Sequence, residues 1–305
     1  MAARVTFFIL SIALLLITTY GDGGSVVFTY SGDTGPDKWG SLSPNYTECS
    51  SGTSQSPINI VTDSAEFNKS LTALAINYQA TNATLLNKCY CVGLHYDGYA
   101  GKLTVDGKNY TLKQMHWHTP SEHKIDGVIY DAELHLVHAS DDGNLTVVAI
   151  LYKVDDDDDD HDHDHDHDHN HNHDLDQDHD HDHDHDHDHD DDDPVLDELE
   201  DQIEEMTPNA CSSHNISSIP VGSFDPNLVG QSTCVGCKLY YRYLGSLTTP
   251  PCSENVLWHV LGNVRKISNE QVQALKAPLD SGCKTNSRPV QQLNARQVER
   301  YDAAD

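Results

Sequence analysis

The stretch Gln114-Met115-His116-Trp117-His118 decides how the rest of the chain is interpreted. Side chains alternate between the two faces of a β-strand, so a strand here would place Gln114, His116 and His118 on one face. A second stretch, Ala132-Glu133-Leu134-His135, would place Glu133 and His135 on one face in the same way. Two neighbouring strands would then direct three imidazole rings toward one point.

Three histidines that leave a fourth position open are typical of a catalytic zinc site, whereas structural zinc sites are closed by four protein ligands. Gln114 and Glu133 each lie two positions before one of the histidines. We expect them to accept the second ring N–H and to fix the tautomer of the ligand. The sequence therefore predicts one Zn²⁺ ion held by three histidines. Four of the other histidines outside the Asp/His tract described below are assigned to structural or surface positions, namely His123, His138, His214 and His259.

The composition is dominated by one segment. Residues 155–193 hold 22 Asp and 13 His among 39 residues, and without them the formal net charge of the 305-residue chain falls from −31 to −9 (27 acidic against 18 basic residues). Neither part is basic, which argues against nucleic-acid binding. The segment offers almost no apolar side chain that could be buried, so we expect a disordered insertion. It would be either a solvated surface loop or a region that binds divalent metals, because His and Asp are ligands for such ions.

The N-terminus has the features of a signal peptide. Arg4 precedes an apolar run over residues 7–17, and small residues follow at 21–24. The run is too short to favour a spanning helix, so we expect residues 1–24 to be removed and no membrane anchor to remain. The secretory route that this predicts leads to the extracellular space, or to vacuoles or plastids. Six Asn-x-Ser/Thr sequons are then candidate glycan sites, at Asn45, Asn68, Asn82, Asn109, Asn144 and Asn215.

From about Leu74 to Val154 the chain is predicted to form successive short strands, and further strands are predicted after the insertion. Residues 74–78, 102–105, 110–113, 147–152, 239–244 and 256–261 are apolar or alternate in polarity. Asp106-Gly107 is a hairpin signal between two of them. Apolar residues at 196, 199, 203 and 206 recur at helical spacing, and Ser268 is placed to cap a second helix. Residues 25–305 are therefore expected to form one mainly antiparallel β domain, interrupted by the insertion at 155–193.

Several motifs together resemble the α-class carbonic anhydrases, and among these the plant type. They occur in the order of that family, over residues 28–300 outside the insertion. They are Gln55-Ser56-Pro57-Ile58-Asn59-Ile60, His116-Trp117-His118, Ser121-Glu122-His123, Ala132-Glu133-Leu134-His135-Leu136-Val137-His138, Gly245-Ser246-Leu247-Thr248-Thr249-Pro250-Pro251-Cys252 and Asn286-Ser287-Arg288-Pro289.

The resemblance implies a large twisted sheet with short peripheral helices and a zinc ion at the bottom of a cleft. It also implies reversible hydration of carbon dioxide to bicarbonate and a proton. His116, His118 and His135 match the zinc ligands. Thr248 matches the hydroxyl that orients the nucleophile, and Glu122 matches the carboxylate that orients that hydroxyl. The pocket for carbon dioxide would be formed by Val137, Val147, Leu247, Thr249 and Trp258.

Two further features follow from the resemblance. Cys49 and Cys252 match the disulfide of secreted members, while Cys89, Cys91, Cys211, Cys234, Cys237 and Cys283 allow 15 connectivities. Tyr90 occupies the position where fast members have a proton-relaying histidine, and His95 is a nearby histidine that aligns five positions further on. Tyrosine has a reference pKa near 10 and relays protons poorly at neutral pH, which leaves the rate of turnover open.

We therefore interpret the chain as a secreted zinc carbonic anhydrase acting on carbon dioxide and bicarbonate. The alternative is a weak or inactive family member that serves as a storage or metal-binding secreted protein. The sequence does not decide the oligomeric state.

Overall fold

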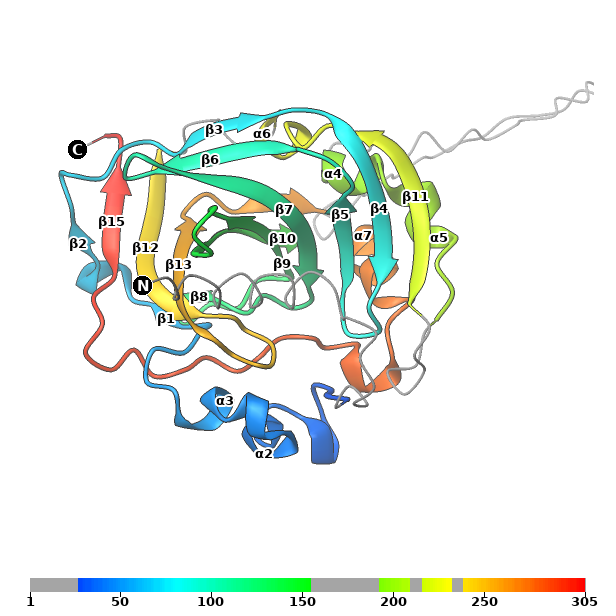
Figure 1. The fold of residues 1–305 in the computed structure, drawn as a ribbon, viewed down its shortest axis with the longest axis horizontal. Helices are drawn as coiled ribbons and strands as arrows, with labels where there is room; N and C mark the ends of the chain where they lie inside the picture. Colours follow the sequence, from blue (N-terminus) through cyan, green and yellow to red (C-terminus); the bar gives the residue numbers. More distant parts are fainter. Residues whose placement is uncertain (1–26, 155–191, 209–215, 232–237, 305) are drawn as a thin grey trace, which may run out of the picture.

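A computed structural model describes residues 27–154, 192–208, 216–231 and 238–304. Its centre is a twisted sheet of 13 strands, flanked by a two-stranded sheet (Figure 1). The main path through the large sheet runs β11-β4-β5-β7-β9-β10-β13-β12-β15-β2. The strands are β1 Asn59–Ile60, β2 Glu66–Phe67, β3 Ala75–Tyr78, β4 Thr81–Asn87, β5 Val92–Tyr96, β6 Gly101–Val105, β7 Lys108–His118, β8 Lys124–Ile125, β9 Ala132–Ala139, β10 Leu145–Val154, β11 Ser217–Phe224, β12 Leu239–Ser246, β13 Glu254–Leu261, β14 Arg265–Ile267 and β15 Glu299–Asp302.

The predicted fold class is confirmed. Most neighbouring strands of the large sheet are antiparallel, and the parallel pairs there are β10 with β13, β10 with β14, and β15 with β2. The hairpin predicted at Asp106-Gly107 joins β6 to β7, with φ angles of 48° and 77° at the two turn residues. Both angles are positive, as a two-residue turn that matches the strand twist requires.

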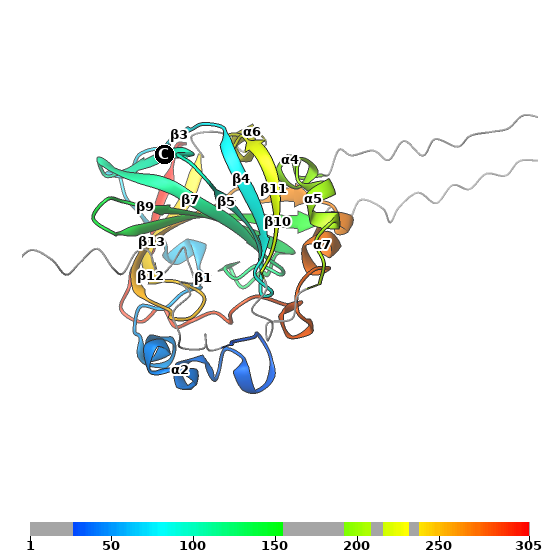
Figure 2. The same cartoon turned by 45° about the vertical axis from the view of Figure 1, so that its right-hand side comes forward.

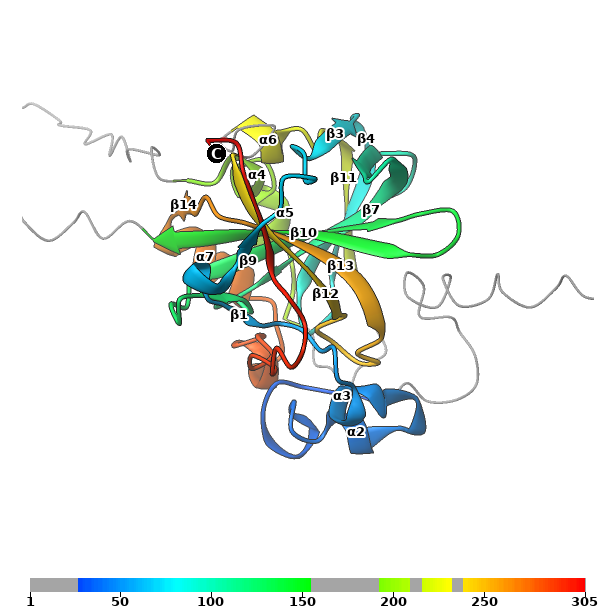
Figure 3. The ribbon, with the colours of Figure 1, turned by 90° about the vertical axis from the view of Figure 1, so that its left-hand side faces the viewer.

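Short helices surround the sheet. Ser268 accepts a hydrogen bond from the backbone N–H of Gln271 and caps α7, as predicted. The expected amphipathic helix consists of two short pieces, α4 and α5, which lie with α7 beside β11 and β4 (Figures 1 and 2). In Figure 3, α2 and α3 lie at one end of the molecule, below β12 and β13. The helices are α2 Trp39–Leu42, α3 Glu48–Ser51, α4 Pro194–Asp197, α5 Glu200–Glu204, α6 Leu228–Gln231 and α7 Asn269–Lys276, with 3-10 turns at Gly32–Thr34, Pro44–Tyr46, Thr62–Ser64 and Ser281–Cys283.

The two faces of the central strands bury different sets of side chains. On one face, which we call the core face, Leu134 and Leu136 of β9 join the large apolar cluster that also takes up α4, α5 and α7. On the other, which we call the cleft face, Val137 of β9 and Trp258 of β13 belong to a second cluster. The alternation follows from the two-residue period of a strand. It places His135 on the cleft face and His138 on the core face.

The end of the expected insertion lies inside the folded domain. Asp193, which we assigned to the insertion, is buried and pairs with Arg265 on β14 at 2.9 Å. Its carboxylate also accepts the backbone N–H groups of Val195 and Leu196 at the start of α4. At the other end, Val154 pairs with Ile267, also on β14. Both ends of the segment are therefore anchored at the same short strand, and the insertion ends before Asp193.

The predicted signal peptide and the Asp/His tract from residue 155 to 191 lie outside the described residues. In the part of the chain that the structure describes, no helix is both long and apolar enough to cross a membrane.

Candidate metal centre

Three histidines on the cleft face point at one another. β7 and β9 are antiparallel neighbours in which His116 lies opposite His135 and His118 lies opposite Glu133. One ring nitrogen from each of His116, His118 and His135 lies within 4.8 Å of the others. The strand register therefore brings together the three residues that the sequence analysis selected.

The second nitrogen of each ring is held by an oxygen. His116 Nδ1 lies 2.8 Å from Gln114 Oε1, and His135 Nε2 lies 2.6 Å from Glu133 Oε1. His118 Nδ1 lies 2.7 Å from the backbone oxygen of Asn286. Because an oxygen of this kind only accepts, each ring must donate through this nitrogen. The nitrogens left with lone pairs are His116 Nε2, His118 Nε2 and His135 Nδ1.

These lone pairs fit a cation. His116 Nε2 and His135 Nδ1 face each other at 3.3 Å, and His118 Nε2 is buried without a hydrogen-bond partner among the described residues. Two facing lone pairs repel unless a proton or a metal lies between them. Burial lowers the pKa of all three histidines, so the rings stay neutral at neutral pH. A neutral three-nitrogen site buried in protein matches the ligand set of a catalytic zinc ion.

Glu133 organises more of the site than the sequence indicated. Its Oε2 accepts the backbone N–H groups of Glu122 and His123, and its Oε1 lies 2.6 Å from both His123 Nδ1 and His135 Nε2. Burial alone would raise the pKa of Glu133, but the neighbouring His123 and His135 hold it well below its usual value. The carboxylate is therefore ionised and fully hydrogen-bonded.

His123 continues this chain of hydrogen bonds away from the metal centre. Its Nε2 lies 2.7 Å from the Tyr243 hydroxyl, which lies 2.8 Å from Ser56 Oγ. Ser56 Oγ in turn accepts the backbone N–H of Ser246, two residues before Thr248. Of the two positions predicted for His123, structural or surface, the structure shows the first. His123 is a buried link between Glu133 and the loop that carries Thr248.

Glu122 and Thr248 lie at the edge of the same site. Glu122 Oε1 accepts the backbone N–H of Arg288 at 3.0 Å and lies 3.5 Å from His118 Nδ1. Burial raises the pKa of Glu122 to about 7, against the lowering effects of His135, the Arg288 N–H and the Thr248 hydroxyl. Thr248 is thus close enough to act on the carboxylate. Glu122 Oε2 has no hydrogen-bond partner of ordinary geometry within the described residues.

A cavity of about 330 Å³ opens onto the three histidines. Trp258 lies edge-on to His135, with ring centroids 4.8 Å apart, and its Nε1 donates to the backbone oxygen of Ser246. The indole is therefore fixed against the metal centre. All the residues that we predicted for the substrate pocket line the cavity together with Thr248, namely Val137, Val147, Leu247, Thr249 and Trp258.

Comparison with known proteins agrees with this geometry. The model of the eukaryotic-type carbonic anhydrases matches residues 34–170 and 186–302. The chain belongs to the eukaryotic-type carbonic anhydrase family. It is 32% identical to "Alpha carbonic anhydrase 7" of Arabidopsis thaliana over 269 residues, which is 88% of this chain and 82% of that protein.

Solved structures show the same fold. The crystal structure of dioscorin complexed with ascorbate superimposes with a TM-score of 0.73 at 32% identity, covering 90% of this chain and 98% of dioscorin. The α-carbonic anhydrase of Thermovibrio ammonificans in complex with sulfanilamide gives a TM-score of 0.69 at 31% identity, covering 90% and 100% of the two chains. The family thus includes both proteins named carbonic anhydrase and proteins named otherwise.

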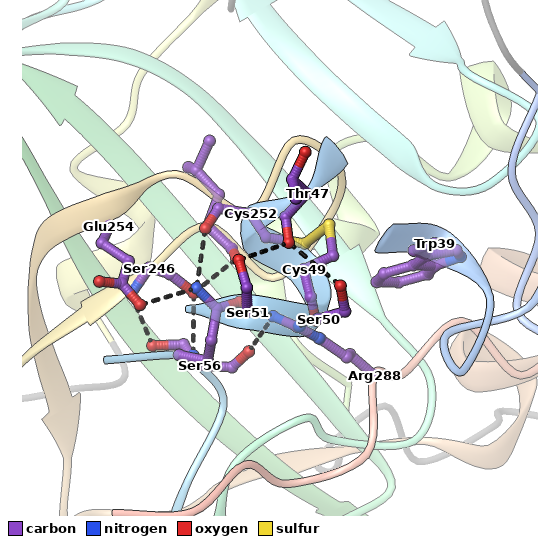
Figure 4. The surroundings of a disulfide bond; sticks show 12 residues. Trp39, Thr47, Cys49, Ser50, Ser51, Ser56, Ser246, Cys252, Glu254 and Arg288 are labelled. Atoms are coloured by element: carbon purple, nitrogen blue, oxygen red, sulfur yellow. Dashed lines mark hydrogen bonds between the residues drawn. A yellow bond between two sulfur atoms is a disulfide. The ribbon is translucent and has the colours of Figure 1, made fainter. Parts of the chain in front are cut away.

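The disulfide expected from the carbonic anhydrase resemblance is present. Cys49 on α3 is bonded to Cys252, with the Cα atoms 5.0 Å apart. Gln55 Nε2 donates to the Cys252 oxygen, and Arg288 donates to the Cys49 oxygen and to Gln55 Oε1. Figure 4 shows the disulfide, Arg288 and Glu254 around the base of the Thr248 loop. Covalent and hydrogen-bonded contacts from three chain segments therefore hold that loop.

The other cysteines are partly described. Cys89 takes part in a disulfide. Cys91 and Cys283 are buried thiols, and burial raises the pKa of Cys91 to about 11 and that of Cys283 to about 12. Cys211, Cys234 and Cys237 lie outside the described residues, so the connectivity of this set stays a prediction.

Tyr90 and His95 are the two groups considered for proton relay, and only Tyr90 lines the cavity. Tyr90 lines the cavity but packs against Phe28 with ring centroids 4.8 Å apart, and burial raises its pKa further. His95 lies on β5 opposite Gln114, outside the cavity lining, and burial lowers its pKa to about 3. A relay must take up and release a proton near neutral pH. Neither side chain has the pKa for this task.

The sequence does not indicate which residues hold the site through main-chain atoms. Asn286 holds His118 through its main-chain oxygen, while its side chain accepts from Thr119 N and donates to the oxygens of Tyr90 and Trp117. Any residue offers a main-chain oxygen, so only the position of Asn286 in a family motif could have indicated its role.

Of the candidate glycan sites, four asparagines are exposed: Asn45, Asn82, Asn109 and Asn144. Asn68 is half-buried and its Nδ2 donates to Glu299 at 2.5 Å. Asn215 lies outside the described residues.

Proposed function

We propose that the protein binds one Zn²⁺ ion through His116, His118 and His135 and catalyses the reversible hydration of carbon dioxide to bicarbonate and a proton. The observation that carries this proposal is the set of three inward lone pairs, each imposed by an oxygen that holds the other ring nitrogen. Zinc held by neutral ligands keeps its full charge and acidifies water, and the carbonic anhydrases are the best-known case of this chemistry.

The chain's own residues would supply the rest of the reaction. One hydroxyl carries a single donor and two lone pairs. If Thr248 donates to Glu122, its lone pairs face the metal centre and accept a hydrogen bond from the nucleophile there. The backbone N–H of Thr248 would stabilise the charge that develops on the bicarbonate. Holding the nucleophile in the correct orientation toward carbon dioxide lowers the barrier of the reaction.

Carbon dioxide is apolar, so it needs an apolar wall beside a strong nucleophile. Val137, Val147 and Leu247 provide such a wall in the cavity, next to the histidines. The buried network through Glu133, His123 and Tyr243 would keep the ligands and the Thr248 loop in register. Such support from outside the ligand set typically matters ten- to a hundredfold for metal affinity or activity.

The test combines two measurements on the purified full-length protein. We expect about one tightly bound zinc per chain, and carbon dioxide hydration that disappears on chelation and returns with added Zn²⁺. The alternative is a storage or metal-binding protein. The observation that supports this alternative is the structural similarity to dioscorin. Stoichiometric zinc without hydration would favour that alternative.

We further propose that the Asp/His tract is a separable insertion that binds additional divalent ions. Its ends leave the domain at Val154 and return at Asp193, and both are anchored at β14. An insertion whose ends meet costs the fold little entropy. We also propose that the protein is secreted after removal of residues 1–24, and that it carries glycans at the exposed asparagines.

A further inference from the structure

The cavity contains two positive charges that the proposed reaction does not use. Lys88 follows β4 and Lys113 lies on β7, and both side chains line the cavity together with His116. Neither ammonium group forms a salt bridge or a side-chain hydrogen bond within the described residues. By contrast, Lys108 on the same strand is paired with Asp142 at 2.7 Å.

A β-bulge turns Lys113 into the cavity. The register between β7 and β9 shifts between Leu112, opposite His138, and Gln114, opposite Val137, so Lys113 is the extra residue. Leu112 belongs to the core face and Gln114 to the cleft face. In a regular strand Lys113 could not share the side of Gln114. Bulges of this kind re-aim a side chain, and they are frequent next to functional sites.

The surroundings do not neutralise these charges. Burial lowers the pKa of Lys88, as expected for an ammonium group that has lost water without gaining a carboxylate. The ionisable groups that interact with Lys88 are Cys91, His95 and His116. The one carboxylate among the described lining residues is Glu254, on the far strand β13. Its Oε1 already accepts from Ser54 N and Gln55 Nε2.

We propose that Lys88 and Lys113 form a binding site for the carboxylate group of a small organic anion. The lysines come from the β4–β7 side of the cavity, whereas Val137, Val147 and Leu247 come from β9, β10 and the loop after β12. A ligand with an apolar body and one carboxylate would bury the body against those side chains and neutralise the lysines. The volume of about 330 Å³ restricts the ligand to a small molecule.

The test compares benzoate with benzamide, which have the same ring and differ in charge. Dissociation constants are measured by NMR titration on the full-length protein as purified. We expect benzoate to bind about fivefold more tightly than benzamide, because a difference of this size is typical of one ion pair. This preference should vanish in the double variant Lys88→Gln/Lys113→Gln, and Lys113→Arg should retain it. Lys69→Gln removes the same charge from an exposed position outside the cavity and should leave the preference unchanged.

None of these substitutions removes a metal ligand, so an attraction of benzoate to the metal would persist in the double variant. Equal affinities of the wild type for the two probes, no binding of either, or a preference that survives in the double variant would each overturn the proposal. None of these outcomes bears on zinc content or hydration, which are measured separately.

Discussion

His135 and His138 lie on the same strand, are equally buried and have opposite surroundings. On the cleft face, His135 has one nitrogen on a carboxylate and directs the other at two further histidines. On the core face, His138 Nε2 lies 2.7 Å from the Tyr78 hydroxyl, and its Nδ1 has no partner within the described residues. His259 also lies on that face. Its Nδ1 lies 3.2 Å from the Thr146 hydroxyl, and its Nε2 has no hydrogen-bond partner in the described part of the chain. Burial of histidine alone does not make a metal site; convergence with imposed tautomers does.

The largest expected effect comes from substituting one histidine on each face of β9. His135→Ala should lose most of its zinc and all measurable hydration, because two histidines cannot hold the ion in a tetrahedral site. His138→Gln is the matched control, which removes a buried histidine from the same strand and should keep zinc and activity. Metal analysis and stopped-flow hydration measure both. Zinc loss in the control, or its retention in His135→Ala, would break the comparison.

The core-face histidines should make the free energy of unfolding depend on pH. Burial lowers the pKa of His138 to about 4 and that of His259 to about 3. The unfolded chain takes up protons near pH 6.5 while the folded chain does not. Stability is therefore full above pH 6.5 and is lost as pH falls toward the folded pKa values. Between pH 7.5 and 5.5 the pair should cost about 3 kcal/mol of unfolding free energy.

Urea unfolding at the two pH values measures this loss. His138→Gln should reduce the measured loss by about 1.4 kcal/mol, the share of one such histidine, while the other buried histidines continue to contribute. An equal loss in wild type and variant would show that other groups cause the acid sensitivity.

On the cleft face, Thr248 can be separated from the metal ligands. Thr248→Ala should keep its zinc but hydrate about 100-fold more slowly, the usual cost of removing one preorganised hydrogen-bonding group. Thr249→Ala lines the same cavity and should change the rate far less. Zinc content and kcat/KM are the readouts, and an unchanged rate in Thr248→Ala would refute its orienting role.

The smallest effect concerns proton release from the cleft. Tyr90 and His95 both have pKa values far from neutral. Turnover should therefore rise with buffer concentration, and Tyr90→His should increase kcat a fewfold in weak buffer while leaving kcat/KM unchanged. Stopped-flow assays over a buffer series would show this. A wild type that is fast and indifferent to buffer would mean that another group relays protons.

How far the sequence predicts this structure depends on which atoms are involved. Alternation on two strands was enough to place His116, His118 and His135 together, and family motifs led to the fold and to the Cys49–Cys252 bond. The role of Asn286 depends on a main-chain oxygen, which carries no residue-type signal. The direction of Lys113 depends on a bulge, which a strict two-residue period cannot predict.

The proposed function depends on the three histidine ligands, and X-ray absorption at the zinc edge tests them most directly. The sample is the protein without residues 155–191, so that the Asp/His tract cannot contribute ions or ligands. We expect about one zinc per chain, with three imidazole nitrogens at about 2.0 Å and one oxygen donor. His138→Gln should give the same spectrum. A protein that retains no zinc once the tract is removed, or a spectrum with mainly oxygen or sulfur ligands, would contradict the three-histidine site.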